Sequence, residues 1–129
     1  MNTDREALNK VSERVIGSAY AVGNTLGSGF LEKVYENAMV HELRKNGMQV
    51  VQQHSIAVKY DSIVVGDYVA DILIENRVLV EVKAVRALDD MHKAQCLNYL
   101  KGTGLKLCLL INFGNLRVDI KRIIQDQQR

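Results

Sequence analysis

The chain has 129 residues, of which 47% are hydrophobic and 25% charged, and its formal net charge is only +2. This length suffices for a core without staples, so residues 1–129 are expected to form one domain. No apolar run reaches the ~18 residues that a membrane-spanning helix needs, and no signal peptide is visible in the charged residues 1–25, so we expect a soluble cytoplasmic protein. The weak positive charge permits a nucleic-acid partner without arguing for one, and the absence of Trp disfavours a stacking platform for single strands.

Two helices are predicted at the start of the chain. Apolar residues recur at helical spacing from Leu8 to Leu26 and again from Phe30 to Leu43. Gly23, Gly27 and Gly29 break the pattern in a glycine-rich turn. Asn46-Gly47 then ends the second helix.

Strands follow, because valine becomes frequent and the apolar residues begin to alternate. We expect strands over residues 48–60, 63–74 and 78–84, separated by turns at 61–62 and 75–77. Asp89-Asp90 then caps a helix that runs to about Lys101, and strands over 105–112 and 116–124 complete the chain. The order α-α-β-β-β-α-β-β predicts an α/β sandwich with a mixed sheet.

Three ionisable residues, Asp71, Glu81 and Lys83, interrupt two strands that are otherwise rich in Val, Leu and Ile. An unpaired buried charge is costly, so these residues need partners. Glu81 and Lys83 share a face because side chains alternate along a strand. Asp71 joins them only if residues 75–77 form a three-residue loop, which pairs position 71 with 81 and gives Asn76 or Arg77 a left-handed conformation. A two-residue loop would turn Asp71 to the opposite face.

Two carboxylates on one face suit Mg²⁺ or Mn²⁺, which prefer hard oxygen ligands and keep several waters. Such an ion lowers the pKa of a bound water and neutralises charge on a phosphate. A lysine beside it orients or deprotonates the attacking water, or holds the phosphate. The pattern Asp-x9-Glu-x-Lys is weak by itself, since a plain ion pair between Glu81 and Lys83 explains it as well.

Further motifs resemble those of the GxxExxY family, a branch of the PD-(D/E)XK nuclease superfamily. The stretch Gly29-Phe30-Leu31-Glu32-Lys33-Val34-Tyr35 reads as the motif that names this family. The Asp71 strand, Glu81-Val82-Lys83 and Gln95-Cys96-Leu97-Asn98-Tyr99 follow in the order of that family, and the match runs from about residue 15 to 124. The resemblance implies a restriction-endonuclease-like core, αβββαβ, with a mixed sheet flanked by helices and an extra N-terminal helix. Ala70 stands where the superfamily's name has proline, a departure common in divergent branches.

The resemblance also implies a metal and catalytic site. Its residues would be Asp71, Glu81 and Glu32 as metal ligands, and Lys83, Glu32, Gln95 and Tyr99 as catalytic groups. The activity implied is Mg²⁺- or Mn²⁺-dependent hydrolysis of phosphodiester bonds in nucleic acid, DNA before RNA, and a homodimer is left open. The alternative is a non-catalytic module that keeps the nuclease fold to bind nucleic acid or protein.

The helix residues of these motifs also have plainer explanations. Glu32 suits the first turn of any helix, where the macrodipole favours an acid, and Glu36, one turn later, is expected to be solvated. Tyr35 falls in the apolar stripe and is expected in the core with its hydroxyl group satisfied. Gln95 and Tyr99 are one turn apart and can simply brace their helix against the sheet.

Overall fold

The structure is a computed structural model that describes residues 3–126. Its elements are, in chain order, α1 (Thr3–Leu26), α2 (Glu32–Lys45), β1 (Val50–Tyr60), β2 (Ile63–Ile74), β3 (Val78–Lys83), α3 (Asp90–Thr103), β4 (Leu107–Asn112) and β5 (Asp119–Ile124). The predicted order of helices and strands is confirmed. From the start of α2 onward the boundaries differ by at most three residues, and the largest shift is the one at the start of β5.

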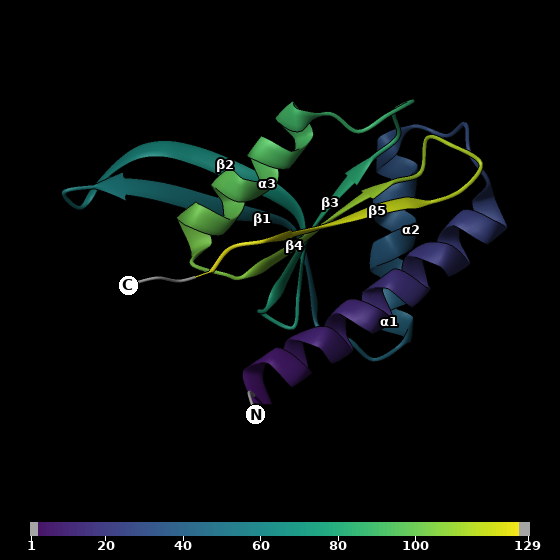
Figure 1. Cartoon of the computed structure of the whole chain (residues 1–129), viewed down its shortest axis with the longest axis horizontal. Helices are drawn as coiled ribbons and strands as arrows, with labels where there is room; N and C mark the ends of the chain where they lie inside the picture. The colour runs from purple at the N-terminus through teal and green to yellow at the C-terminus, as the bar shows by residue number, and fades with distance from the viewer. Residues whose placement is uncertain (1–2, 127–129) are drawn as a thin grey trace.

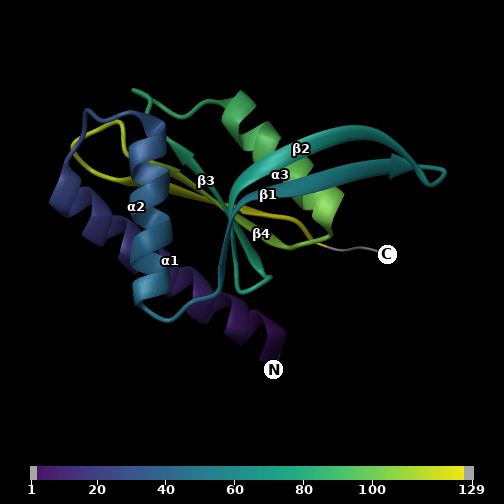
Figure 2. The same ribbon diagram turned by 180° about the vertical axis from the view of Figure 1, so that it is seen from behind.

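The five strands form one mixed sheet in the order β1-β2-β3-β4-β5. Only β3 and β4 are parallel, and α3 is the crossover between them; the other neighbouring strands are antiparallel. Helices α1 and α2 cover one face of the sheet, and α3 lies on the other, against the long β1–β2 hairpin (Figures 1 and 2). No helix within residues 3–126 is both long and apolar enough to cross a membrane.

The central strands are buried on both faces, which explains their almost continuous apolar sequence. Val78, Val80 and Val82 of β3 pack into the core beneath α1 and α2. The alternate residue Leu79 packs into a second core beneath α3. Glu81, two positions further, therefore lies on the α3 side of the sheet, where it contacts Tyr99.

Two helical glycines set how closely the helices approach their neighbours. Gly23 was predicted to belong to the turn after α1, but it lies inside that helix. A Cβ atom at this position would overlap the side chain of Val118, which explains why the residue is glycine. On the other face, a Cβ at Gly102 of α3 would come within 2.7 Å of Ile56 Cγ2 on β1. Close packing, and not helix termination, explains both glycines.

The β1–β2 hairpin changes the face that it buries part-way along its length. Near its base, Ile72 and Ile74 belong to the core under α1 and α2, whereas Ile56 and Ala70 belong to the core under α3. The pairing register stays constant across this change. The change occurs at Gln53, whose φ of 59° is left-handed, while the other non-glycine residues with positive φ in the described chain lie in the two hairpin turns.

Candidate active site

The β2–β3 turn sets the position of the candidate residues. Ile74 pairs with Val78, which leaves the predicted three-residue loop, and the Arg77 N–H donates to the Ile74 carbonyl at 2.9 Å. Asn76 is left-handed, as predicted, but its left-handed neighbour is Glu75 and not Arg77. The loop length was therefore correct, and its backbone bends one residue earlier than expected.

This register brings Asp71 opposite Glu81. The Asp71 N–H donates to Glu81 Oε1 at 3.4 Å, and the Val82 N–H donates to Asp71 Oδ2 at 2.8 Å. Lys83 Nζ lies 3.6 Å from Glu81 Oε2, so the ion pair considered as an alternative does form. It is nevertheless part of a larger group, because Tyr99 of α3 donates its hydroxyl to the same Oε2 atom at 3.2 Å.

The carboxylates of this group are held in an environment that disfavours their charge. Glu81 is only 4% exposed. Burial, and next the negative charge of Asp71, raises the pKa of Glu81 to about 7, against the opposing effect of Lys83. Burial likewise raises the pKa of Asp71, although the hydrogen bond from Val82 opposes it. The buried carboxylate of Glu81 and the half-buried carboxylate of Asp71 thus face a single ammonium group, which leaves room for a further positive charge.

Helix α2 adds acidic residues to one side of the group. Glu32, at its first turn, is exposed, whereas Glu36 is only 4% exposed. The expectation that Glu36 is solvated was wrong, because its carboxylate is satisfied by protein donors: Lys33 Nζ at 3.0 Å from Oε1, and Gln52 and Gln53 Nε2 at 2.7 and 2.9 Å from Oε2.

The charges of both helix acids reach Asp71. After burial, the repulsion from Glu36 raises the pKa of Asp71, and the repulsion from Glu32 does so less strongly. Gln53 also connects the two elements, since its Nε2 atom lies 3.4 Å from Asp71 Oδ1. The structure thus brings Glu36 into the neighbourhood predicted for Glu32, one turn along the same helix.

The first and last residues of the Gly-x-x-Glu-x-x-Tyr motif, Gly29 and Tyr35, have structural roles. Tyr35 is buried, as predicted, and donates its hydroxyl to the Gly27 carbonyl at 2.6 Å while accepting from the Phe30 N–H at 3.2 Å. Its ring stacks on Phe113 with centroids 4.7 Å apart. Gly29 has a φ of 113°, which other residues rarely adopt. Glycine and tyrosine therefore shape the α1–α2 loop, and through it the start of the helix that carries Glu32.

Helix α3 contributes its two motif residues unequally. Tyr99 is buried and contacts Glu81, whereas Gln95 is half-buried and makes no side-chain hydrogen bond within residues 3–126. Gln95 instead lines a hollow of about 430 Å³ near the start of the helix, together with Asp89 and His92. Asp89 caps the helix, as predicted, by accepting from the His92 N–H at 3.1 Å.

Asn112, which the sequence did not single out, supports the segment that follows Lys83. It is fully buried at the end of β4, beside Lys83 on the parallel strand β3. Its side chain accepts from the N–H groups of Val85 at 2.9 Å and Gly114 at 3.0 Å, and it donates to the Val85 carbonyl at 2.9 Å. In the sequence, the one feature that indicates this role is that Asn112 is a polar residue at the end of the apolar run 105–112.

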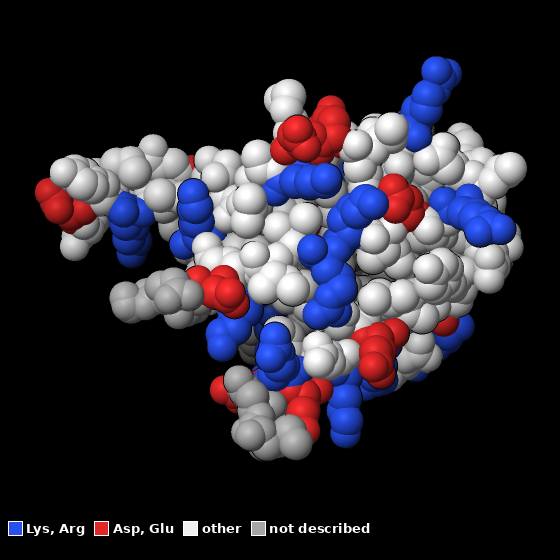
Figure 3. Space-filling view, viewed as in Figure 1, with Lys and Arg blue, Asp and Glu red and all other residues white. Residues whose placement is uncertain are grey.

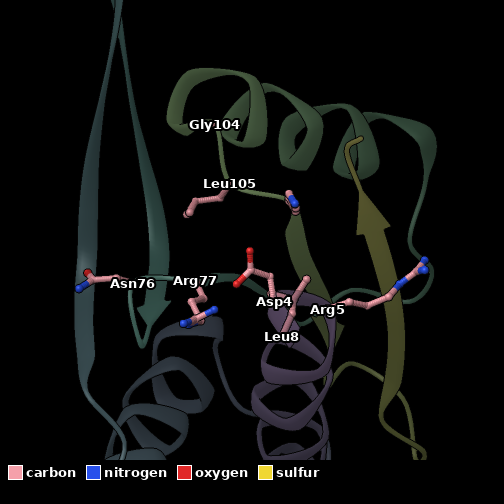
Figure 4. Close-up of a pocket in the computed structure, with 8 residues that line it drawn as sticks. Asp4, Arg5, Leu8, Asn76, Arg77, Gly104 and Leu105 are labelled. Atoms are coloured by element: carbon pink, nitrogen blue, oxygen red, sulfur yellow. The ribbon is translucent and has the colours of Figure 1, made fainter. Parts of the chain in front are cut away.

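Another hollow lies away from this group. It measures about 260 Å³ and is lined by residues of the α1 start, the β2–β3 turn and the α3–β4 connection, among them Asp4, Asn76 and Arg77 (Figure 4). It lies at the start of β3, and Lys83 lies at the end of that six-residue strand, about 17 Å away at the usual strand rise. This hollow contains none of the candidate residues.

Comparison with known proteins identifies the family. Residues 9–123 match the family model of the PD-(D/E)XK nuclease superfamily. The chain belongs to this superfamily. No curated protein matches it in sequence. The restriction-endonuclease-like core predicted from the motifs, with helices around a mixed sheet, is confirmed, whereas the GxxExxY branch stays a prediction.

Two solved structures have a similar fold. An alkaline exonuclease (LHK-Exo) from Laribacter hongkongensis aligns with a TM-score of 0.55 and 15% identity, over 73% of this chain and 56% of that chain. The protein SSO0001 aligns with a TM-score of 0.55 and 18% identity, over 93% of this chain and 60% of that chain. This PD-(D/E)XK chain thus spans less than two thirds of either neighbour, and at these identities the likeness concerns the fold.

PD-(D/E)XK nucleases generally use divalent metal ions, and the donor set here fits one. Mg²⁺ is usually held by one or two carboxylates and keeps several waters. Asp71 and Glu81 supply two such carboxylates, and a bound cation would offset the burial that raises the pKa of both. A site with more protein ligands is not apparent, since no group of three or more His, Cys, Asp or Glu side chains within residues 3–126 is placed to hold a metal.

Proposed function

We propose that this chain is a metal-dependent nuclease that hydrolyses phosphodiester bonds of nucleic acid, DNA in preference to RNA. The observation that carries the proposal is the pair of the buried Glu81 and the half-buried Asp71, with Lys83 on the same face as Glu81. These two carboxylates and one lysine carry a net negative charge, and they are the residues that match the superfamily motif. The same motifs support placing the chain in the GxxExxY branch.

Asp71 and Glu81 would hold the metal, which is Mg²⁺ or Mn²⁺ in this proposal. When bound, the ion supplies an acidified water and positive charge for the phosphate. Lys83 keeps its ammonium beside Glu81 at 3.6 Å, from where it hydrogen-bonds a phosphate oxygen or the attacking water. Tyr99 holds Glu81 in place through its hydroxyl group. In the net reaction the water hydroxyl adds to phosphorus, the bond to the leaving oxygen breaks, and that oxygen receives a proton.

Two further site residues extend this proposal. Glu32 is the exposed first residue of α2 and Gln95 lies half-buried in the second turn of α3, and we assign them contacts with metal-bound water and substrate. Lys and Arg are interspersed with Asp and Glu on the face shown in Figure 3, so a long electrostatic track for nucleic acid is not visible there. A domain of this size has little surface with which to grip a duplex, which favours a homodimer. Sedimentation of the free protein tests whether it is a homodimer. The cytoplasmic location stays a prediction.

Cleavage assays test the activity. Plasmid, single-stranded DNA, branched DNA and RNA would each be incubated with the protein and Mg²⁺ or Mn²⁺. Asp71→Ala and Lys83→Ala are expected to abolish cleavage. Asp67→Ala is the matched control, because Asp67 is a carboxylate on the same strand but is exposed. Cleavage that is absent in the wild type, or undiminished in both site variants, would support the alternative of a non-catalytic binding module.

A further inference from the structure

Two consecutive glutamines on β1 hold the same carboxylate. Gln52 Nε2 and Gln53 Nε2 lie 2.7 and 2.9 Å from Glu36 Oε2. Successive side chains of a regular strand point to opposite faces of the sheet, so they cannot both reach one group on one helix. The left-handed backbone at Gln53, with a φ of 59°, breaks this alternation and brings both amides to the same side.

This backbone conformation is unfavourable for glutamine, which has no local reason to adopt it. Residues with side chains enter the left-handed region rarely and mainly in turns, but Gln53 lies within β1, between Gln52, which pairs with Ile72, and His54, which pairs with Ala70. The residue itself is exposed, so burial of its side chain does not offset the strain. Strain of this kind persists where the surrounding structure requires it, often at functional sites.

The second contact of Gln53 shows what the strain achieves. Register places Gln53 across from Asp71, and its Nε2 atom lies 3.4 Å from Asp71 Oδ1 as well as 2.9 Å from Glu36 Oε2. One amide thus spans a carboxylate on α2 and a carboxylate on β2. The other Asp71 oxygen is occupied by the Val82 N–H at 2.8 Å, so Gln53 contacts the oxygen that remains available to an incoming cation.

We propose that Gln53 is a positioning residue that holds Glu36 and Asp71 at a set separation, and that the strained backbone of β1 is retained for this purpose. This role rests on the proposed function, in which Asp71 holds a divalent metal ion. Groups that orient metal ligands typically change metal affinity or activity by about 10- to 100-fold when they are removed. Gln53 acts through the carboxylates and needs no contact with the substrate.

Glycine substitution separates this role from a structural one. Gln53→Gly removes the amide but accepts the left-handed backbone, so the thermal midpoint should stay within a few degrees of the wild type. Ser62→Gly is the matched control: Ser62 has a φ of 67° but lies in the turn at the tip of the β1–β2 hairpin. Gln52→Ala is the second control, since it removes a donor to Glu36 and leaves Asp71 untouched.

The measurement is calorimetric titration of each 129-residue variant with Mn²⁺ alone, with Asp71→Ala as the baseline. We expect Gln53→Gly to bind Mn²⁺ at least about tenfold more weakly than the wild type, Ser62→Gly to bind it unchanged, and Gln52→Ala to show a smaller loss. Equal affinity of Gln53→Gly and the wild type would overturn the positioning role and leave the nuclease proposal standing. If the wild type gives no more heat than Asp71→Ala, the metal site itself is absent, and both proposals fall.

Discussion

Replacing the buried carboxylate at position 81 by its neutral isostere should stabilise the metal-free protein at high pH. The pKa of Glu81 rises from its ordinary value of 4.5 to about 7 on folding, because of burial and then the charge of Asp71. A shift of this size corresponds to about 3 kcal/mol of folding free energy at about 1.4 kcal/mol per pKa unit. It already includes the favourable effects of Lys83 and Tyr99 on the carboxylate.

The sign of the effect sets the pH window. A carboxyl group with a raised pKa holds its proton more tightly when the protein is folded, so folding is favoured at low pH and loses stability as the pH rises from 4.5 to about 7. Glu81→Gln removes this loss. We therefore expect the variant to be more stable than the wild type by about 3 kcal/mol above pH ~8 and equally stable below pH ~4.

Urea unfolding in the presence of EDTA, followed by circular dichroism at several pH values, measures this difference. Glu32→Gln is the matched control, since Glu32 is exposed and its replacement should give no such pH-dependent difference. Adding Mg²⁺ should then reduce or reverse the stability difference between the variant and the wild type, because only the wild type would bind the ion. Binding adds about 2.7 kcal/mol to the free energy of unfolding at a hundredfold excess over Kd. A variant that is less stable than the wild type at high pH without metal would refute the reasoning.

Three further substitutions test the surroundings of the site. Tyr99→Phe removes the donor to Glu81 and should raise the pKa of that carboxyl further, so the pH profile of Mn²⁺ binding should move to higher pH. Asn112→Ala removes both hydrogen bonds to Val85 inside the protein and should cost about 2 to 3 kcal/mol in urea unfolding. Gly23→Ala adds a methyl group that overlaps the side chain of Val118. It should lower stability by about 1 to 3 kcal/mol even though alanine favours helix; an unchanged urea midpoint would show that the contact between α1 and Val118 adjusts freely.

The Asp71–Glu81 pairing was predictable because it depends on local rules. Side chains alternate along each strand, and the length of the turn at 75–77 fixes which positions face each other. The structure confirms the predicted pairing of Ile74 with Val78, and Asp71 follows from it. The order of elements was predictable for a similar reason, since the period of the apolar pattern changes at each boundary.

The α2 side of the site was not predictable in this way. Glu36 has the sequence context of an exposed helix residue, and its burial depends on Gln52 and Gln53, which are distant in sequence. Those glutamines reach it only because the backbone at Gln53 is left-handed, and nothing in a run such as Val-Val-Gln-Gln-His marks a strand residue for that conformation. A local sequence pattern therefore predicts the regular geometry of a strand, but it does not predict an irregular backbone such as that at Gln53.

That exception explains how one site draws on both layers of helices. Glu36 belongs to α2, on one face of the sheet, and Tyr99 belongs to α3, on the other. In a regular sheet, side chains from opposite faces do not meet around one pair of carboxylates. Here the hairpin changes its buried face at Gln53 and Asp71, so that Asp71 is connected to Glu36 through Gln53 while its neighbour Glu81 contacts Tyr99. A residue that restored regular strand geometry at position 53 would therefore separate the two halves of the site, even with every carboxylate still in place.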